Sequence, residues 1–392
     1  MRLHAEALVA TATKLISADD GCRWPLPFRG LIAAAQIATV ILNWTQWSVR
    51  EYPPLLPLVP VPQFDMGGPM IAAVAASFFY PRIGIPIQAA VLLWAIASDQ
   101  SRLQPQMLSM LYLSCGTLPG AKGGLILSRA SLISLWFFSG IHKLTSPDFF
   151  AHGMPWLLSS LGLPADGMLP LLVGLGFGGA EVALGIGSLI PSLRKGVATA
   201  AFFMHATIFA VLSPLGINWN PEVLPWNVVL AFAGLALIWP WRDRAPGLAW
   251  RDSSRAARAA AVLLLVSPAG YWLGLVDAYL AHCLYSENTP RAFVCDCFSR
   301  RSIHLICDDA GVQVPPAHRL FRPLFLGVGR AGQWLEIEDP RWIARWRGLA
   351  PRKVLWSDLL PEDLEIVVPG MDEPHRPTAR REGGHAATPP GP

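Results

Sequence analysis

Long apolar stretches separated by short polar turns fill the chain from residue 28 to residue 285. A helix that crosses a membrane needs about 20 apolar residues, and fewer when it is short or broken. The pattern therefore predicts an all-α polytopic membrane protein with about nine transmembrane helices. The predicted spans are 28–48, 67–81, 83–99, 104–120, 123–142, 168–191, 196–214, 222–241 and 258–284. The second and third are separated only by the turn at Arg82, so one bent re-entrant unit is an alternative for them.

The pattern changes on both sides of this transmembrane domain, residues 28–285. Residues 286–369 alternate short apolar and charged runs, which predicts a small mixed α/β or β-containing extramembrane C-terminal domain. Residues 370–392 are polar and rich in Pro and Gly, which predicts disorder. Residues 1–27 are mixed in polarity and form an N-terminal segment.

Charge indicates the orientation of the spans. Only 15% of the residues are charged, against roughly 25% in an average soluble domain. The outer loops hold Arg50, Arg102 and Lys143 if the N-terminus is cytoplasmic. The inner segments then hold a larger basic set, as the positive-inside rule requires: Arg2, Lys14, Arg23, Arg82, Lys122, Arg194, Lys195, Arg242, Arg244, Arg251 and Arg255. We therefore expect an integral protein of a bacterial inner membrane, embedded in the lipid bilayer, with its C-terminal domain outside. The net charge of +4 is spread over short loops and does not favour nucleic acid as a partner.

Ionisable groups inside spans are costly, so each is a candidate for function. Lys143 ends its span, where either an ion pair with Asp148 or a desolvated amine that acts as a base is expected. Glu181 needs a partner, such as Arg129 or His205, or a role in a cavity. His205 is a hydrogen-bonded core group or a proton relay, and Asp277 is expected to face the outer vestibule.

The turn at residues 213–228 is rich in amides, tryptophans and prolines. These side chains are either interface anchors or the lining of a polar mouth beside Lys143. The candidate cofactor-binding residues are Asn218, Trp219, Asn220, Trp226 and Asn227.

The stretch FFSGIHKLTSPDFF, residues 137–150, carries a recognisable motif. It runs through Phe138, Ser139, Gly140, Ile141, His142, Lys143, Leu144, Asp148 and Phe149. This motif resembles the signature of the horizontally transferred transmembrane (HTTM) domain, which includes vitamin K-dependent gamma-carboxylase, and overlaps with DoxX-like and MauE-like membrane proteins. The resemblance implies a quinone or hydroquinone cofactor, with Lys143 as the base that deprotonates its reduced form.

Two functions follow as hypotheses. The first is a quinone-dependent membrane oxidoreductase or carboxylase-like enzyme, with Lys143, His142, Glu181 and His205 as candidate catalytic residues. The alternative is a non-catalytic membrane anchor or assembly partner of a redox or maturation system, which binds a protein through the C-terminal domain.

The cysteines show no zinc-type spacing, and no metal site is expected. Cys307 is expected to form a disulfide with Cys295 or Cys297 if the C-terminal domain lies in an oxidising compartment. A thiol–quinone relay through these residues is the alternative.

Overall fold

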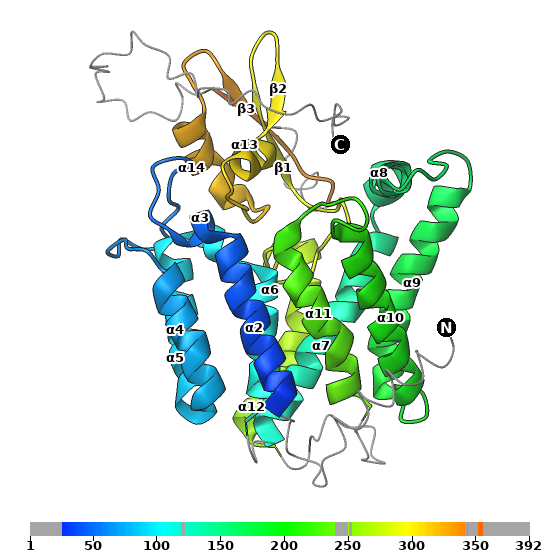
Figure 1. Cartoon of the computed structure of the whole chain (residues 1–392). Coiled ribbons are helices and arrows are strands. Elements are labelled where there is room, and N and C mark those ends of the chain that lie inside the picture. Colours follow the sequence, from blue (N-terminus) through cyan, green and yellow to red (C-terminus); the bar gives the residue numbers. More distant parts are fainter. Residues whose placement is uncertain are drawn as a thin grey trace.

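The fold is taken from a computed structural model, which describes residues 26–118, 122–239, 250, 253–341, 343 and 352–355. The tail predicted to be disordered, residues 370–392, and residues 1–25 of the N-terminal segment lie outside the described residues. The described part of the chain is a bundle of helices with a small sheet domain at one end (Figure 1). We refer to the end of the bundle under this domain as the capped end.

Each of the predicted spans corresponds to a helix of the bundle. These helices are α2 (Leu26–Leu42), α4 (Gly67–Phe79), α5 (Pro81–Ser98), α6 (Pro105–Cys115), α7 (Lys122–Leu144), α9 (Leu169–Leu189), α10 (Arg194–Leu212), α11 (Leu224–Leu237) and α12 (Arg255–Val266). Short elements connect them: α3 (Trp44–Trp47), η1 (Gln100–Arg102), the π-helix η2 (Phe149–Gly153), α8 (Met154–Ser160), η3 (Pro221–Val223) and η5 (Ser267–Leu273).

Five of the described helical segments are long and apolar enough to cross a membrane, as expected of an integral membrane protein. They are Pro81–Ser98, Lys122–Leu144, Leu169–Leu189, Arg194–Leu212 and Arg255–Leu273. Three shorter apolar helical segments are Leu26–Leu42, Gly67–Phe79 and Pro221–Leu237. The count of nine crossing helices therefore remains a prediction. Helices α4 and α5 are separate elements that meet closely, because a Cβ built on Gly84 would lie 2.3 Å from the backbone of Ala76.

Helix α7 is the central element of the bundle. Within its most apolar window 78% of the residues are buried, whereas the other four long segments have between 17% and 33% buried. A polar residue on α7 therefore faces neighbouring helices rather than lipid, and needs a partner among them.

The C-terminal part is β-containing, as the alternating pattern predicted. Strands β1 (Arg291–Cys295), β2 (Arg300–Ser302), β3 (Trp334–Glu338) and β4 (Arg352–Leu355) form an antiparallel sheet in the order β2-β1-β3-β4. Helices α13 (Ile303–Asp309) and α14 (His318–Val328) complete the domain. Leu335 and Ile337 alternate with polar residues along β3, so one face of the strand contributes to a core that also contains Phe321 and Phe325.

The sheet domain is joined to the bundle by polar contacts. The Gln313 backbone N–H donates to Oε1 of Gln46 at 2.8 Å, and Gln104 Nε2 donates to the Gln313 carbonyl at 3.1 Å. Arg319 Nε donates to Oε1 of Gln100 at 2.6 Å, and Arg319 also pairs with Asp277. Asp277, which was expected to face the outer vestibule, is partly exposed at this junction, where it pairs with Arg319 of α14.

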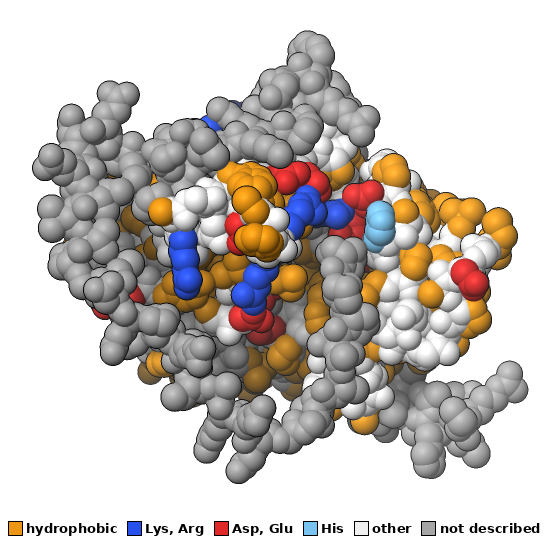
Figure 2. Space-filling model, turned by 90° about the horizontal axis from the view of Figure 1, so that it is seen from above, with side chains coloured by type: hydrophobic (Ala, Val, Ile, Leu, Met, Phe, Trp, Pro, Cys, Tyr) orange, Lys and Arg blue, Asp and Glu red, His pale blue; other side chains and the backbone are white. Residues whose placement is uncertain are grey.

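The buried guanidinium of Arg102 stabilises the bundle side of this junction. Arg102 is fully buried, and its donors contact the carbonyls of Gln46, Trp47 and Ser48 at 3.0–3.2 Å. The carboxylate of Asp99 offsets part of the positive charge of Arg102 and Arg50: its Oδ2 lies 3.9 Å from Arg102 Nε and 2.7 Å from Arg50 Nη2. Seen from above, the capped face carries acidic and basic side chains next to one another rather than a patch of one sign (Figure 2).

Candidate functional site

A buried ion pair joins α7 to α9. Lys143 Nζ donates to Glu181 Oε2 at 2.8 Å and to Oε1 at 3.1 Å, and the side chains are only 3% and 7% exposed. Ser139, one turn before Lys143, accepts from Nζ at 2.9 Å and donates to Glu181 Oε1 at 3.4 Å. Opposite charges buried together stabilise each other, because the surroundings screen them less than water does. The site therefore holds two charges with no net charge.

Glycines make this pairing sterically feasible. A Cβ on Gly140 would lie 2.5 Å from the carbonyl oxygen of Gly178, and a Cβ on Gly185 would lie 2.8 Å from the Cβ of Phe137. Small residues at such positions let two helices approach closely in a membrane. Glu181 is one turn beyond Gly178, as Lys143 is one turn beyond Gly140, so the close approach brings their side chains together.

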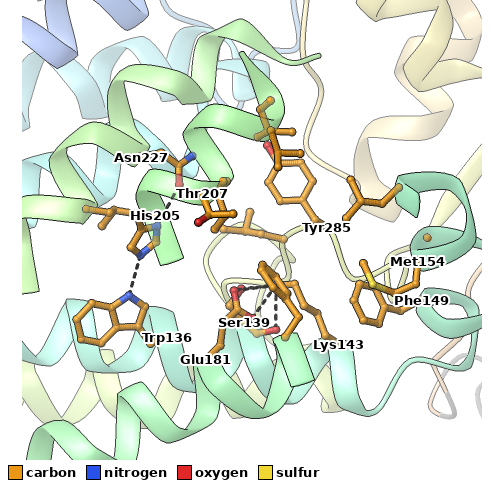
Figure 3. A pocket seen from close by; sticks show the side chains of 18 of the residues that line it. Trp136, Ser139, Lys143, Phe149, Met154, Glu181, His205, Thr207, Asn227 and Tyr285 are labelled. Carbon is orange, nitrogen blue, oxygen red and sulfur yellow. Dashed lines mark hydrogen bonds and ion pairs between the residues drawn. The ribbon is translucent and has the colours of Figure 1, made fainter. Parts of the chain in front are cut away.

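A second polar group faces the same space from α10 and α11 (Figure 3). Trp136 Nε1 donates to His205 Nε2 at 3.0 Å, and His205 Nδ1 lies 3.0 Å from Oδ1 of Asn227. An indole nitrogen only donates, so Nε2 of His205 is an acceptor and Nδ1 carries the proton. Asn227 Nδ2 donates in turn to the Val223 carbonyl at 3.1 Å. His205 is thus a neutral ring with both nitrogens occupied.

These groups line a cavity of about 270 Å³, the lipophilic cavity. Apart from the ion pair and the His205 group, its walls are mainly aromatic and aliphatic side chains from α7, α8, α9, α10 and α11. Phe177 lies beside the amine, with its ring centroid 5.4 Å from Lys143 Nζ. In Figure 3 Lys143, Glu181 and Ser139 lie between the group of Trp136 and His205 on one side and Phe149 and Met154 on the other. The cavity suits a largely apolar ligand that carries one polar, proton-bearing group.

The structure brings most, but not all, of the predicted residues together. Lys143, Glu181 and His205 line the lipophilic cavity, as do Trp219, Trp226 and Asn227. Asn220 lines a neighbouring chamber and donates to the Tyr285 hydroxyl at 3.0 Å. Asn218 lines neither of these two cavities.

His142 is placed outside the lipophilic cavity. Its Nε2 lies 3.1 Å from the Ala281 carbonyl, and its ring stacks on Trp272 at 4.5 Å between centroids. Although it precedes Lys143 in the chain, it points to another face of α7, because successive residues on a helix differ by about 100°. It anchors the segment after α12 to α7.

The expected pairs for Lys143 and Glu181 were wrong. Asp148 pairs with Arg291 of β1 at 2.8 Å, whereas Lys143 takes Glu181. Glu181 pairs with neither Arg129 nor His205. Arg129 donates instead to the Leu237 carbonyl at 3.0 Å.

Sequence reasoning assigned no role to two residues of the site. Trp136 and Ser139 precede Lys143 by seven and four positions, so all three share one face of α7. This spacing was a signal that could have identified them. Tyr285, which also lines the cavity, follows the last predicted span and carried no such signal.

The cysteines of the sheet domain are remote from this cavity. Cys295 ends β1, and Cys297 lies in the turn of the β1–β2 hairpin, which points away from the bundle (Figure 1). Cys297 and Cys307 have free thiols, so the expected disulfide of Cys307 with Cys297 is not formed, and Cys307 is buried in the domain core. This geometry does not favour a thiol–quinone relay.

Comparison with protein-family models, curated proteins and solved structures gives no significant match. Among the described residues, no group of three or more His, Cys, Asp or Glu side chains is placed to hold a metal ion. The function must therefore be argued from the geometry of the lipophilic cavity.

Proposed function

We propose that the protein is a membrane enzyme that binds a lipophilic hydroquinone in the lipophilic cavity and activates it by removing a hydroxyl proton. The observation that carries this proposal is the buried Lys143–Glu181 pair in the wall of an otherwise mainly apolar cavity. Apolar walls favour a ring and a hydrocarbon tail, and the pair supplies the groups that a hydroxyl needs.

The two members of the pair have complementary roles in this step. Glu181 accepts the hydroxyl proton, and the ammonium of Lys143 then pairs with the oxygen anion of the ligand in place of the carboxylate. The site is neutral before and after the transfer, because the ligand gains the charge that Glu181 loses. A preorganised cation at the position where negative charge develops stabilises the product without reorganisation. In this proposal Glu181 is the base, in place of Lys143 as the resemblance implied, and Lys143 stabilises the anion that the ligand becomes.

Quinone binding can be measured directly, because the cavity is lined by Trp136, Trp156, Trp219 and Trp226. The full chain in nanodiscs is titrated with menadione and with decylubiquinone, and quenching of tryptophan fluorescence is followed. We expect saturable quenching that is lost or weakened at least tenfold in the doubly substituted variant Lys143→Met/Glu181→Leu, a loss of about 1.4 kcal/mol or more. Lys195→Ala is the matched control, because Lys195 lies in the first turn of α10, at the opposite end from the cavity. Equal quenching of the wild type and the double variant would contradict the proposal. The proposal would also fail if the wild type shows no quenching and a lipid extract of the purified protein contains no quinone.

We also infer that the capped end faces the outside. The basic residues at the other end of the bundle, among them Arg82, Arg194 and Lys195, support this orientation through the positive-inside rule. Cys297 provides a test, since its thiol is exposed in the hairpin turn. A membrane-impermeant maleimide should label Cys297 in spheroplasts without lysis, and the variant Cys297→Ser should remain unlabelled.

A second candidate function, the anchoring of a partner protein, is favoured by Phe298. Its side chain is 99% exposed, in a turn held by hydrogen bonds from the backbones of Phe298 and Ser299 to Oδ1 of Asp296 at 2.8 and 2.7 Å. Aromatic side chains, including Phe, are enriched in protein–protein interfaces relative to the rest of the surface. Phe298→Ala should leave quinone quenching unchanged, and it should abolish co-purification of a partner if this second function applies.

A further inference from the structure

A second cavity, which we call the polar chamber, lies between the capped end of the bundle and the sheet domain. Its volume is about 280 Å³. Its lining combines residues of the bundle, such as Gln104 and Gln106, with residues of the sheet domain, such as His304 and Gln313. It contacts the lipophilic cavity through a common wall of Trp226, Leu284, Tyr285 and Glu287, which line both spaces.

Two buried polar atoms of the chamber residues have no hydrogen-bond partner among the described residues. They are Nε1 of Trp226, a side chain that is 4% exposed, and Nε2 of His304. Buried polar atoms are rarely left unsatisfied in folded proteins, and those that are need an explanation. Both side chains line the chamber, so these two atoms are candidates for contact with a ligand bound there.

The chemistry of these atoms indicates what such a ligand must offer. Burial lowers the pKa of His304 to about 4, so the ring is neutral near pH 7. A hydrogen bond to the backbone of Val314 occupies its other nitrogen, so Nε2 is an acceptor. It therefore requires a donor on the ligand, whereas the indole N–H of Trp226 requires an acceptor.

The charged groups around the chamber also restrict the ligand, because they disfavour a negative charge. The only guanidinium among its described lining residues, Arg291, is shared by Glu287 at 3.3 Å and Asp148 at 2.8 Å, which leaves this group with one excess negative charge. Glu222 accepts from Gln313 Nε2 at 3.3 Å and forms no ion pair among the described residues. An anion entering the chamber would meet the carboxylate of Glu287, which lines it, with Glu222 behind Gln313, whereas a cation would be stabilised by these groups.

The wall between the two cavities is built from an unusual backbone. All five described non-glycine residues with positive φ lie in the segments 218–220 and 282–287, and Tyr285 and Glu287 of the wall have φ of 50° and 53°. Such conformations cost about 1–3 kcal/mol each and cluster where structure serves a site. A hydrogen bond of 3.0 Å from Asn220 Nδ2 to the Tyr285 hydroxyl stabilises this wall.

We infer that the polar chamber is a second binding site, for a water-soluble ligand that presents N–H donors on an amine or amide group and carries no negative charge. The amides of Gln104, Gln106, Asn220 and Gln313 match the mixed donors and acceptors of such a ligand, and the carboxylates favour its cationic form. The site stands apart from the quinone proposal, because it is defined by different residues and a different ligand.

The test compares three probes of similar shape and different charge. N-acetyl-lysine methylamide, N-acetyl-glutamine methylamide and N-acetyl-glutamate methylamide are titrated into the full chain in nanodiscs, and binding is measured by calorimetry. We expect the lysine probe to bind most tightly, the glutamine probe to bind measurably, and the glutamate probe to bind at least tenfold more weakly than the lysine probe. Tightest binding of the glutamate probe, equal binding of all three, or binding of none would overturn the inference.

Variants locate the bound probe. His304→Phe keeps a ring but removes the acceptor, and Ser302→Trp fills the chamber from the end of β2. Each should weaken binding of the lysine probe at least fivefold, while Val211→Phe in the lipophilic cavity should leave it unchanged and should reduce quinone quenching instead. A probe that binds equally well to His304→Phe, Ser302→Trp and the wild type occupies another site, and the inference then fails while the quinone proposal stands.

Discussion

Gly140 of α7 and Gly178 of α9 are so close that a methyl group on Gly140 would lie 2.5 Å from the Gly178 carbonyl oxygen. The substitution Gly140→Ala must therefore push the two helices apart. We expect it to lower stability by about 1–3 kcal/mol, the range for overpacked interiors. It should also weaken quinone quenching, because it separates Lys143 from Glu181. Denaturation in detergent and fluorescence titration measure the two effects.

Gly179 offers the matched control. It is adjacent to Gly178 on the same helix, yet nothing lies within 4 Å of a Cβ built on it. Gly179→Ala should leave quenching unchanged and raise stability by up to about 1 kcal/mol, because alanine favours a helix more than glycine does. Similar losses in Gly140→Ala and Gly179→Ala would show that the close approach is not what positions the site.

Single and double substitutions of the Lys143–Glu181 pair should distinguish its effect on proton transfer from its effect on stability. Lys143→Met leaves the Glu181 carboxylate buried without its cation, which should cost about 3–5 kcal/mol. The double substitution Lys143→Met/Glu181→Leu removes both charges and should restore stability to within about 1 kcal/mol of the wild type, since buried pairs contribute little net stability over apolar side chains. Proton release by a bound hydroquinone should be lost in both variants. A double variant that retains it would exclude the pair as the base.

His205 should behave as a structural residue. His205→Leu leaves the Trp136 N–H and the Asn227 carbonyl without their partner, and each loss costs about 1–3 kcal/mol. We expect the variant to be less stable in detergent. At temperatures where it remains folded, a bound hydroquinone should still transfer its proton. Full stability combined with lost proton transfer would instead identify His205 as a relay.

Asp308 makes the junction of the two domains sensitive to pH. Burial and the neighbouring carboxylates of Glu222 and Asp309 raise the pKa of Asp308 to about 7 from its usual 3.8. The folded state then holds this proton more tightly than the unfolded state, so its contribution is complete below about pH 4 and is lost as the pH rises through 7. Asp308→Asn should raise the melting temperature at pH 8, with a gain of up to about 1 kcal/mol after allowing for solvent screening, and much less at pH 5. A larger gain at pH 5 than at pH 8 would contradict this assignment.

Much of the fold follows from sequence periodicity. Each predicted span contains a helix, and the alternating segment WLEIE forms β3, because these patterns record which face of an element is buried. Helix lengths were less predictable. The segment predicted as 258–284 is helical in α12 only to Val266, and the chain continues through η5 (Ser267–Leu273) into irregular structure.

The sequence identified part of the residues that line the cavity, but not how they pair. The cost of burying charge singled out Lys143, Glu181 and His205, and all three line one cavity. The partners depend on which helix faces cross, and that depends on contacts such as Gly140 with Gly178 and on the fold of β1, which brings Arg291 to Asp148. Such long-range contacts leave no local trace in the sequence.

The opposite charges of Lys143 and Glu181 lie within 3 Å of one another, so the electric field across an energised membrane pulls on them almost equally and in opposite directions. A proton handed from a ligand to the carboxylate moves only between neighbouring atoms and carries almost no current through the bilayer. The chemistry proposed for this cavity should therefore run at the same rate in polarised and depolarised vesicles, independent of the voltage that the cell maintains.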